Sequence, residues 1–467
     1  METIQASLSN LSILRPAKRE AGNFQSDQTK NLAGDLIFLY SLKRSFSFIS
    51  TRSSHGLHLM NGMVGGFIGR YSERGRFCKA PYIGWSVVDF RLSEEQEMIR
   101  EMAREFCDQE VIPYAEDWDR EGTYPLEAIS KAHDLGLLNV TIPNEYGGAG
   151  MSSIDEMIIC EEMSRGDPGF GTASYHTTLA SFPILTGGTE EQKKEYLGRT
   201  AQGKLAAYCV TEPDAGSDVP ALKTEAVKEG DEYVINGSKA WISGAGYADW
   251  FFVLAYTDKK SGYGGLSGFI VDSDTPGIEL GKKEVNMGQR CSDTRGVSFN
   301  GVRVPESNLI GGEENGGWLN AMRAFDHSRP AVAAAAVGNA RGAMEEAWAY
   351  AKQREAFGKP ISRHQSISFM LADMATKIEA ARLLTYNAAS ALDAGERATL
   401  KAAHAKRFAA DMCMEVTTDA VQVLGGYGYS EEYPVARRMR GAKIYQIFEG
   451  TSQIQRMIIS RELEGDF

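Results

Sequence analysis

The stretch that decides the fold and chemistry of this chain lies near its C-terminus. Residues 443–453 read Lys443-Ile-Tyr-Gln-Ile-Phe-Glu-Gly-Thr-Ser-Gln453, which sets one carboxylate, Glu449, between apolar residues and a glycine. Burial disfavours the charged form of a carboxylate, so its pKa rises toward neutral, and such a base suits removal of a proton from carbon. Taken alone, Phe-Glu-Gly more often marks a surface Glu in a turn before a helix, so the rest of the chain decides.

Five more motifs precede this segment, in a fixed order. Together the six motifs resemble the acyl-CoA dehydrogenase family over roughly residues 88–464, with a spacing most like that of its medium-chain branch. Each motif is weak alone, but six in order are highly specific. The five are Tyr208-Cys-Val-Thr-Glu-Pro-Asp-Ala-Gly-Ser-Asp218, Trp241-Ile-Ser243, Asn286-Met-Gly-Gln-Arg-Cys-Ser-Asp-Thr-Arg-Gly296, Arg354-Glu-Ala-Phe-Gly358 and Gln422-Val-Leu-Gly-Gly-Tyr-Gly428.

Composition and charge exclude several classes of protein. The chain has 467 residues, and its net charge of -12 argues against a nucleic-acid partner. The cysteines are scattered with no Cys-x-x-Cys pair, so we expect neither a zinc site nor a disulfide framework, and we predict no bound metal. The apolar run at residues 36–40 is too short to span a bilayer. No Rossmann, P-loop, His-Glu-x-x-His or Gly-x-Ser-x-Gly motif occurs, so any cofactor is held another way.

Residues 1–79 differ from the rest of the chain. They hold 11 Lys and Arg against 5 Asp and Glu, together with many Ser. Such a basic, Ser-rich leader is typical of an organelle transit peptide, here a mitochondrial one. Two alternatives stay open: translation from Met60 or Met63, which leaves a shorter transit peptide, and a plain disordered tail.

The remaining residues predict three blocks after an extension at 1–85: a helical domain at 86–204, a β-domain at 205–315 and a helical bundle at 316–467. Ser93 with Gln96, and Thr189 with Gln192, form capping boxes, and Pro125 marks a helix start. Further bounds also follow from the pattern. Strands are expected at 233–235, 250–256 and 268–271, and the first is flanked by turns at Gly230-Asp231 and Asn236-Gly237. Residues 262–265 are expected to form a flexible connection. Helices are expected at 318–354, 365–394, 400–424 and 453–461.

The resemblance implies an α+β multi-domain fold, with an N-terminal helical domain, a small central β-domain and a C-terminal four-helix bundle. It also implies FAD as the cofactor. Small residues in the motif at 208–218 let a flat ring lie against backbone N–H groups, whereas the alternative is a polar strand-to-loop turn. In the family, Trp241 covers the other side of the ring by stacking. The flavin contacts implied here are Tyr208, Val210, Thr211, Gly216, Ser217, Trp241 and Ser243.

A second group of residues is implied to reach the FAD of a neighbouring subunit. Arg354 has the planar fork that suits pyrophosphate, and two glycines let backbone approach adenosine. Alternatively, Arg354 forms a surface ion pair and Phe357 belongs to the core. A cofactor completed by two chains implies a homo-oligomer, expected to be a tetramer. The group comprises Arg354, Phe357, Gln365, Gln422, Gly425 and Gly426, and Thr451 and Gln453 complete the site.

The resemblance also assigns the substrate and the base. Ser217, Asp326, Arg329 and Gly450 are implied to bind acyl-CoA; an ordinary i,i+3 helix pair is the alternative for Asp326 and Arg329. Some relatives carry the catalytic Glu at the position of Ser328, which leaves Glu449 as the base here. Glu449 then removes the α-proton, a hydride passes to FAD, and electrons leave to electron-transfer flavoprotein.

Two residues bear on chain length and leave the substrate open. Phe448 stands where the medium-chain relative has Tyr, and Tyr175, followed by His176, stands on the helix that forms the pocket floor. Tyr175 either shortens the acyl cavity or turns into the core. The sequence therefore predicts dehydrogenation of short- to medium-chain acyl-CoA. The alternatives are an acyl-CoA oxidase and a non-catalytic subunit of a respiratory assembly.

Overall fold

The computed structural model describes residues 91–465. The predicted leader, with its alternative start codons, lies outside the described residues. Within residues 91–465 no helix combines the length and the apolar character that crossing a membrane requires. The same part of the chain holds no cluster of His, Cys, Asp and Glu fit for a metal ion.

Helices build the first part of the described chain. The Ser93 hydroxyl accepts from the Gln96 N–H at 3.2 Å, and the Gln96 side chain accepts from the Ser93 N–H at 3.0 Å. Thr189 and Gln192 make the same reciprocal pair, so both predicted capping boxes are confirmed. Pro125 is the N-cap of the third helix. The helices are α2 (Glu94–Glu110), α3 (Ala115–Glu121), α4 (Leu126–Asp134), α5 (Ser153–Gly166), α6 (Pro168–Gly187), α7 (Glu190–Gln192) and α8 (Gly198–Ala201).

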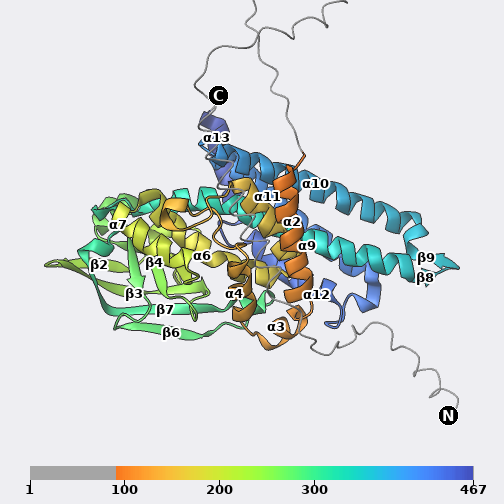
Figure 1. Cartoon of the computed structure of the whole chain (residues 1–467), viewed down its shortest axis with the longest axis horizontal. Helices are drawn as coiled ribbons and strands as arrows, with labels where there is room; N and C mark the ends of the chain where they lie inside the picture. Colours follow the sequence, from red (N-terminus) through yellow and green to blue (C-terminus); the bar gives the residue numbers. More distant parts are fainter. Residues whose placement is uncertain (1–90, 466–467) are drawn as a thin grey trace, which may run out of the picture. The chain divides into compact units, whose positions relative to one another are not determined.

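A seven-stranded sheet follows, in the order β1-β4-β2-β3-β7-β6 with β5 beside β4. Every residue of β4 is buried, as its unbroken apolar sequence predicts. Figure 1 shows most of these strands gathered at one end of the helical layers, with α6 and α7 nearby. The strands are β1 (Ala206–Cys209), β2 (Glu225–Glu229), β3 (Glu232–Ser243), β4 (Trp250–Tyr256), β5 (Leu266–Asp272), β6 (Ile278–Lys283) and β7 (Thr294–Pro305).

The predicted turn at Asn236-Gly237 is wrong. β3 runs through both residues and pairs with β7 on either side of them, with a shift of register between Ile235 and Gly237. A Cβ at Gly237 would lie 2.3 Å from the Thr224 hydroxyl, so this bulge needs glycine. Asn-Gly signals a hairpin only where the chain turns back, and here the continued pairing with β7 outweighs that local preference.

Long helices form the last part of the chain and agree with the predicted bounds. Their contact faces are rich in alanine, and Ala336, Ala340, Ala343 and Ala347 of the first are all fully buried, which lets neighbouring helices approach closely. A short hairpin joins the first two helices at their ends farthest from the sheet (Figure 1). The elements are α9 (Gly317–Gln353), β8 (Glu355–Ala356), β9 (Lys359–Pro360), α10 (Gln365–Asp393), α11 (Thr399–Leu424), α12 (Pro434–Ala442) and α13 (Ser452–Gly465).

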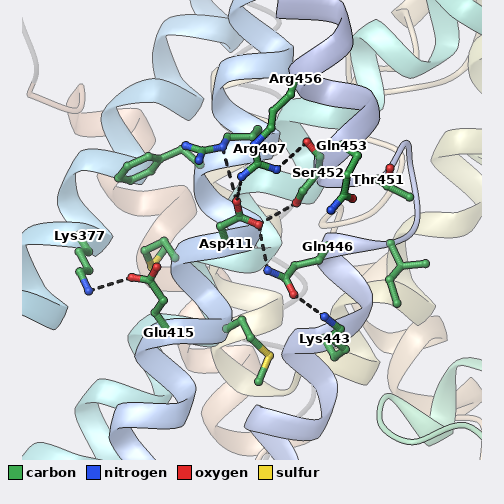
Figure 2. Close-up of a pocket in the computed structure, with 14 residues that line it drawn as sticks. Lys377, Arg407, Asp411, Glu415, Lys443, Gln446, Thr451, Ser452, Gln453 and Arg456 are labelled. Carbon is green, nitrogen blue, oxygen red and sulfur yellow. Dashed lines mark hydrogen bonds and ion pairs between the residues drawn. The ribbon is translucent and has the colours of Figure 1, made fainter.

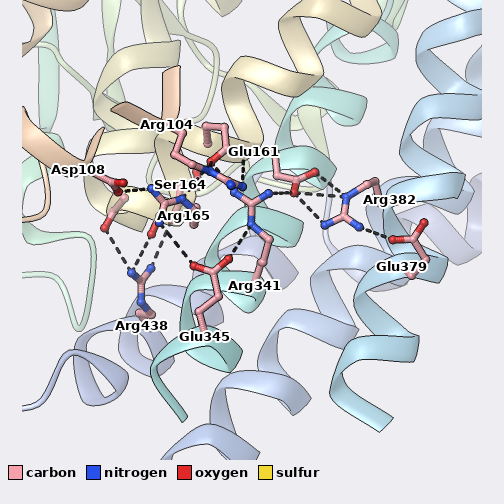
Figure 3. Close-up of polar contacts among 12 residues, drawn as sticks. Arg104, Asp108, Glu161, Ser164, Arg165, Arg341, Glu345, Glu379, Arg382 and Arg438 are labelled. Atoms are coloured by element: carbon pink, nitrogen blue, oxygen red, sulfur yellow. Dashed lines mark hydrogen bonds and ion pairs between the residues drawn. The ribbon is translucent and has the colours of Figure 1, made fainter. Parts of the chain in front are cut away.

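A buried network of charged side chains ties α5 to the C-terminal helices (Figure 3). Arg341 of α9 donates to Glu161 at 2.6 Å and to Glu162 at 2.5 Å. Arg382 of α10 reaches Glu161 at 2.9 Å. Burial on its own would raise the pKa of Glu162, but Arg341 and Arg104 together hold that pKa below its usual value. The network therefore fixes the N-terminal helices against the bundle that carries Glu449.

The Arg341→Met variant is expected to lose about 3–5 kcal/mol of folding free energy, because it leaves two buried carboxylates short of a partner. Urea unfolding of the holoenzyme measures the loss. Arg303→Met is the matched control, since Arg303 also pairs with two carboxylates but its side chain is 53% exposed. That surface variant should change stability by about 1 kcal/mol or less. Equal effects of the two substitutions would contradict a structural role for the buried network.

Candidate active site

Glu449 lies in a tight turn between a 3-10 helix, Lys443–Gln446, and α13. Its backbone φ is 56° and that of Gly450 is 84°, so two successive residues adopt the left-handed conformation. This conformation is strained for a glutamate, and strained residues of this kind persist only where their surroundings hold them. The turn, rather than a regular element, thus determines where the Glu449 carboxylate points.

The Glu449 carboxylate is half-buried and directed into the protein. It accepts a hydrogen bond from the Ser328 hydroxyl of α9 at 2.7 Å. Burial raises its pKa, and Ser328, Arg329 and Lys406 partly offset that rise. The predicted base therefore has the raised pKa that its setting in the sequence suggests, and the alternative of a freely exposed surface Glu does not fit.

The substrate residues predicted on α9 lie next to this carboxylate. Arg329 is 5% exposed and donates to Asp326 at 2.9 Å, so the i,i+3 pair exists. Thr399 donates to the other oxygen of Asp326 at 2.7 Å. The positive charge of Arg329 stabilises the ionised form of Glu449. The structure thus brings Arg329 and Gly450 to Glu449, while contact of Asp326 and Arg329 with CoA stays a prediction.

The segment predicted to lie along the flavin begins at the end of β1 and is anchored by hydrogen bonds from β3. The buried ammonium of Lys239 donates to Glu212 at 2.9 Å and to the Val210 carbonyl at 3.2 Å. The Ala240 N–H donates to the Thr211 carbonyl at 2.9 Å, which fixes the segment to β3 just before Trp241. These bonds give the backbone of residues 210–212 a defined position.

The aromatic side chains near this segment differ in exposure. Trp241 has a φ of 61° and is 61% exposed, so its indole projects from the sheet and is available for stacking. The Tyr208 ring packs on Phe252, and its hydroxyl is buried with no partner among residues 91–465. Burial raises the pKa of Tyr208, and the nearby Glu449 charge raises it further. Ser243 is half-buried, and Gly216 and Ser217 are exposed.

The second predicted group gathers around the β8–β9 hairpin, in a pocket of about 720 Å³ lined by Arg354, Phe357, Gly425 and Gly426. Phe357 and Gly358 have φ values of 50° and 77°, which makes them the two central residues of a hairpin turn. Phe357 at this tip is 96% exposed, and Arg354 forms no ion pair within residues 91–465. The alternatives of a core Phe and a surface ion pair are therefore wrong. Gln365 and Gln422 adjoin the pocket without lining it.

A second pocket, of about 620 Å³, contains Thr451 and Gln453 (Figure 2). Asp411 of α11 organises it, accepting from Gln446 at 2.9 Å and from Ser452 and Arg456 at 2.8 Å each. These bonds attach the segment that follows Glu449 to α11. They also direct Thr451 and Gln453 toward the same pocket.

Tyr175 and His176 have different roles in the structure. His176 is buried, its ring nitrogens lying 2.7 Å from the Tyr124 hydroxyl and 2.7 Å from the Ala206 carbonyl, so it links α6 to the sheet. Tyr175 is half-buried against a small apolar cluster that includes Ala331 and Ala334 of α9. Its hydroxyl has no partner within residues 91–465, and burial raises its pKa, with smaller contributions from Glu156, Cys160 and, last, Glu449. Tyr175 thus lies on the α9 side that carries the base.

Several residues around the site were missed from the sequence alone. Most act through a partner distant along the chain: the hydrogen bond of Ser328 to Glu449 spans 121 residues, and that of Lys239 to Glu212 spans 27. In the sequence these residues look like ordinary polar positions, because local periodicity does not show which of them the fold will bury. The others missed are Lys406, Asp411 and Gln455.

The chain matches three family models in the order expected. Their descriptions are acyl-CoA dehydrogenase, N-terminal domain, over residues 93–204; middle domain, over 207–302; and C-terminal domain, over 315–464. The match covers most of the chain and confirms the three-domain fold that the motifs predict.

Curated relatives carry related names. A protein of Caenorhabditis briggsae named probable medium-chain specific acyl-CoA dehydrogenase 2, mitochondrial, is 47% identical over 382 residues, which are 81% of this chain and 92% of the relative. The short-chain specific acyl-CoA dehydrogenase of Clostridium acetobutylicum is 45% identical over 379 residues, 80% of this chain and 100% of the relative.

Solved structures have the same fold. Butyryl-CoA dehydrogenase from Megasphaera elsdenii superposes with a TM-score of 0.79 at 42% identity, over 81% of this chain and 100% of that one. A chain from a study of the electron transferring flavoprotein of Acidaminococcus fermentans gives a TM-score of 0.79 at 44% identity. The match covers 80% of this chain and 99% of that one.

Proposed function

The chain belongs to the acyl-CoA dehydrogenase family of FAD-dependent enzymes, and from this premise we propose that it oxidises short- to medium-chain acyl-CoA to trans-2-enoyl-CoA, the first step of fatty-acid β-oxidation. The observation that carries the proposal is the setting of Glu449. Its half-buried carboxylate has a raised pKa and accepts a hydrogen bond from the Ser328 hydroxyl, and its charge acts on Tyr208 of the segment predicted to hold the flavin.

In this proposal Glu449 removes the α-proton of the acyl thioester. Ser328 holds one carboxylate oxygen, so the other is free to approach that proton. The Glu449 N–H donates to no acceptor among residues 91–465, so it is free to donate to the thioester carbonyl, where charge grows as the proton leaves. When bound, FAD supplies the redox chemistry by accepting the hydride from the β-carbon.

The residues present fit an FAD shared between two chains. The exposed Trp241 ring and the backbone of residues 210–212 fit a flat ring, whereas the Arg354 guanidinium and exposed Phe357 fit a pyrophosphate and adenosine. Yet the β8–β9 hairpin and the sheet lie at opposite ends in Figure 1. Along α9 alone, Arg354 is about 37 Å from Arg329, at 1.5 Å per residue. One dinucleotide does not bridge both groups, so we propose that Arg354 and Phe357 serve the FAD of a second copy within a homotetramer.

Electron-transfer flavoprotein is the acceptor that we propose, in the mitochondrial matrix. The name of the Caenorhabditis briggsae relative includes a mitochondrial location, and the basic leader of residues 1–79 favours the same compartment. The study that yielded the similar Acidaminococcus fermentans chain concerns an electron transferring flavoprotein.

Colour and bleaching test the proposed reaction. The purified protein should be yellow and should bleach when a saturated acyl-CoA is added without oxygen. A panel of acyl-CoA from C4 to C16 then defines the chain length. Rapid reoxidation by oxygen with stoichiometric hydrogen peroxide would instead favour the oxidase, and a colourless protein that takes up no FAD would favour the non-catalytic subunit.

Tyr175 is proposed to close the acyl cavity, because it packs against Ala331 and Ala334 of α9, the helix that also carries Ser328 beside Glu449. The Tyr175→Ala variant should prefer acyl chains about two carbons longer. Each buried methylene contributes about 0.8 kcal/mol, so two should raise kcat/KM for the longer substrate roughly tenfold, with little change for butyryl-CoA. Tyr175→Phe is the matched control, since it keeps the ring and should keep the wild-type profile. An unchanged preference in Tyr175→Ala would place Tyr175 in the core instead.

A further inference from the structure

The turn that carries Glu449 is held through its backbone carbonyls. The Gln455 amide donates to the Glu449 carbonyl at 3.2 Å and to the Gly450 carbonyl at 3.0 Å. The Lys406 ammonium donates to the same Gly450 carbonyl at 2.6 Å, the shortest of the three bonds. Because Glu449 and Gly450 are both left-handed, these donors restrain a conformation that the chain does not favour by itself.

Lys406 is unusual for its position in α11. Its side chain is fully buried, and among residues 91–465 its ammonium reaches one acceptor, the Gly450 oxygen. An ammonium has three N–H donors, so most of its hydrogen-bonding capacity is lost on burial. An apolar side chain of similar length would fill this space at lower cost. Packing alone therefore does not account for a lysine here.

The charges that surround Lys406 come from three elements. Glu449 favours its charged form from the turn, Arg329 of α9 opposes it, and Asp411 favours it from α11 itself. Burial is the largest influence and lowers the pKa of Lys406 to about 7. Below that pH the ammonium is charged, and it also stabilises the ionised form of Glu449. Lys406 thus acts on the base in two ways, through the backbone of Gly450 and through its charge.

We propose that Lys406 is a positioning residue for the reaction: by holding the Gly450 carbonyl it fixes the turn that directs the Glu449 carboxylate and N–H toward the acyl thioester, and it places a cation behind the base. This inference rests on the proposed role of Glu449 as the base. Lys406 itself contacts neither substrate nor cofactor in this proposal.

Three variants test the inference with two readouts, kcat against KM and the pH profile of kcat/KM. Lys406→Met removes both the hydrogen bond and the charge. Lys406→Gln keeps an N–H donor but not the charge. Lys401→Met is the control, since Lys401 lies on the same helix but its side chain is 39% exposed and pairs with Glu396. Each protein is assayed per bound FAD, with octanoyl-CoA and an artificial electron acceptor.

For Lys406→Met we expect kcat to fall about 10- to 100-fold, since displacement of a catalytic group by about 1 Å can cost 10²-fold, while KM changes less than about threefold. A base acts in its ionised form, so kcat/KM rises with pH through the pKa of Glu449. Loss of the Lys406 cation raises that pKa, so the acid limb should move to higher pH, and most clearly below about pH 7. Lys406→Gln should show the same displaced limb but a kcat within about tenfold of wild type.

Wild-type kcat and an unmoved acid limb in Lys406→Met would overturn the inference. A lower melting temperature or FAD content with unchanged kcat and pH profile per FAD would also overturn it, because Lys406 would then be only structural. If the Met variant does not fold, the acid limb of Lys406→Gln decides in the same way. The proposed function fails separately, if Glu449→Gln retains its turnover.

Discussion

Replacement of Glu449 by Gln is expected to abolish turnover while FAD and acyl-CoA still bind. The amide keeps the shape of the side chain and still accepts from the Ser328 hydroxyl, but it has no basic lone pair for the α-proton. General-base catalysis contributes roughly 10²–10⁴-fold, and here no step proceeds without proton removal, so the loss should reach the upper end or exceed it. Single-turnover bleaching of the bound flavin by octanoyl-CoA, with no electron acceptor present, measures this step directly.

The control is Glu464→Gln, which makes the same chemical change at an exposed position near the end of α13. It should bleach at the wild-type rate. Binding of acyl-CoA to Glu449→Gln, followed as a perturbation of the flavin spectrum, shows that the pocket is intact. Bleaching within tenfold of wild type in Glu449→Gln would place the base elsewhere, and Tyr208, whose hydroxyl is buried nearby, would be the next residue to substitute.

Features set by neighbouring residues could be predicted from the sequence. The capping boxes at Ser93 and Thr189 were predicted because a cap needs only residues three positions apart. The strand at Trp250–Tyr256 was predicted because an unbroken apolar run of that length is typical of a strand buried on both faces. The chemistry of Glu449 came from the resemblance, and the structure adds the hydrogen bond and the burial that suit it to the role.

Features set by pairing across the chain could not be predicted. Asn236-Gly237 has the local preference of a hairpin turn, but β7 continues its pairing past that point and makes it a bulge. Lys406 and Asp411 look like ordinary polar positions of a helix, and only the fold shows that they face the backbone and side chains of residues 446–456. Whether a helical Lys is exposed or buried depends on what packs against it, and local periodicity does not carry that information.

The placement of Arg354 leads to the second large effect that we expect. Its side chain is exposed, forms no ion pair within residues 91–465 and lies 5.9 Å from the centre of the Tyr427 ring, in the pocket that also contains Gly425 and Gly426. If it serves the FAD of a second copy, Arg354→Ala should lose a hydrogen bond to a charged group worth about 1.5–3 kcal/mol, which weakens FAD binding roughly 10- to 100-fold. Because that FAD is shared, cofactor loss and dissociation of the oligomer should occur together.

Size-exclusion chromatography at several FAD concentrations tests this coupling. Arg354→Ala should elute as smaller species with substoichiometric FAD, and excess FAD should restore the tetramer, because a ligand that binds only the assembled form stabilises it by mass action. Arg363→Ala is the control, since Arg363 lies on the same connection but does not line the pocket. A fully loaded, unchanged tetramer of Arg354→Ala would show that the hairpin takes no part in cofactor binding.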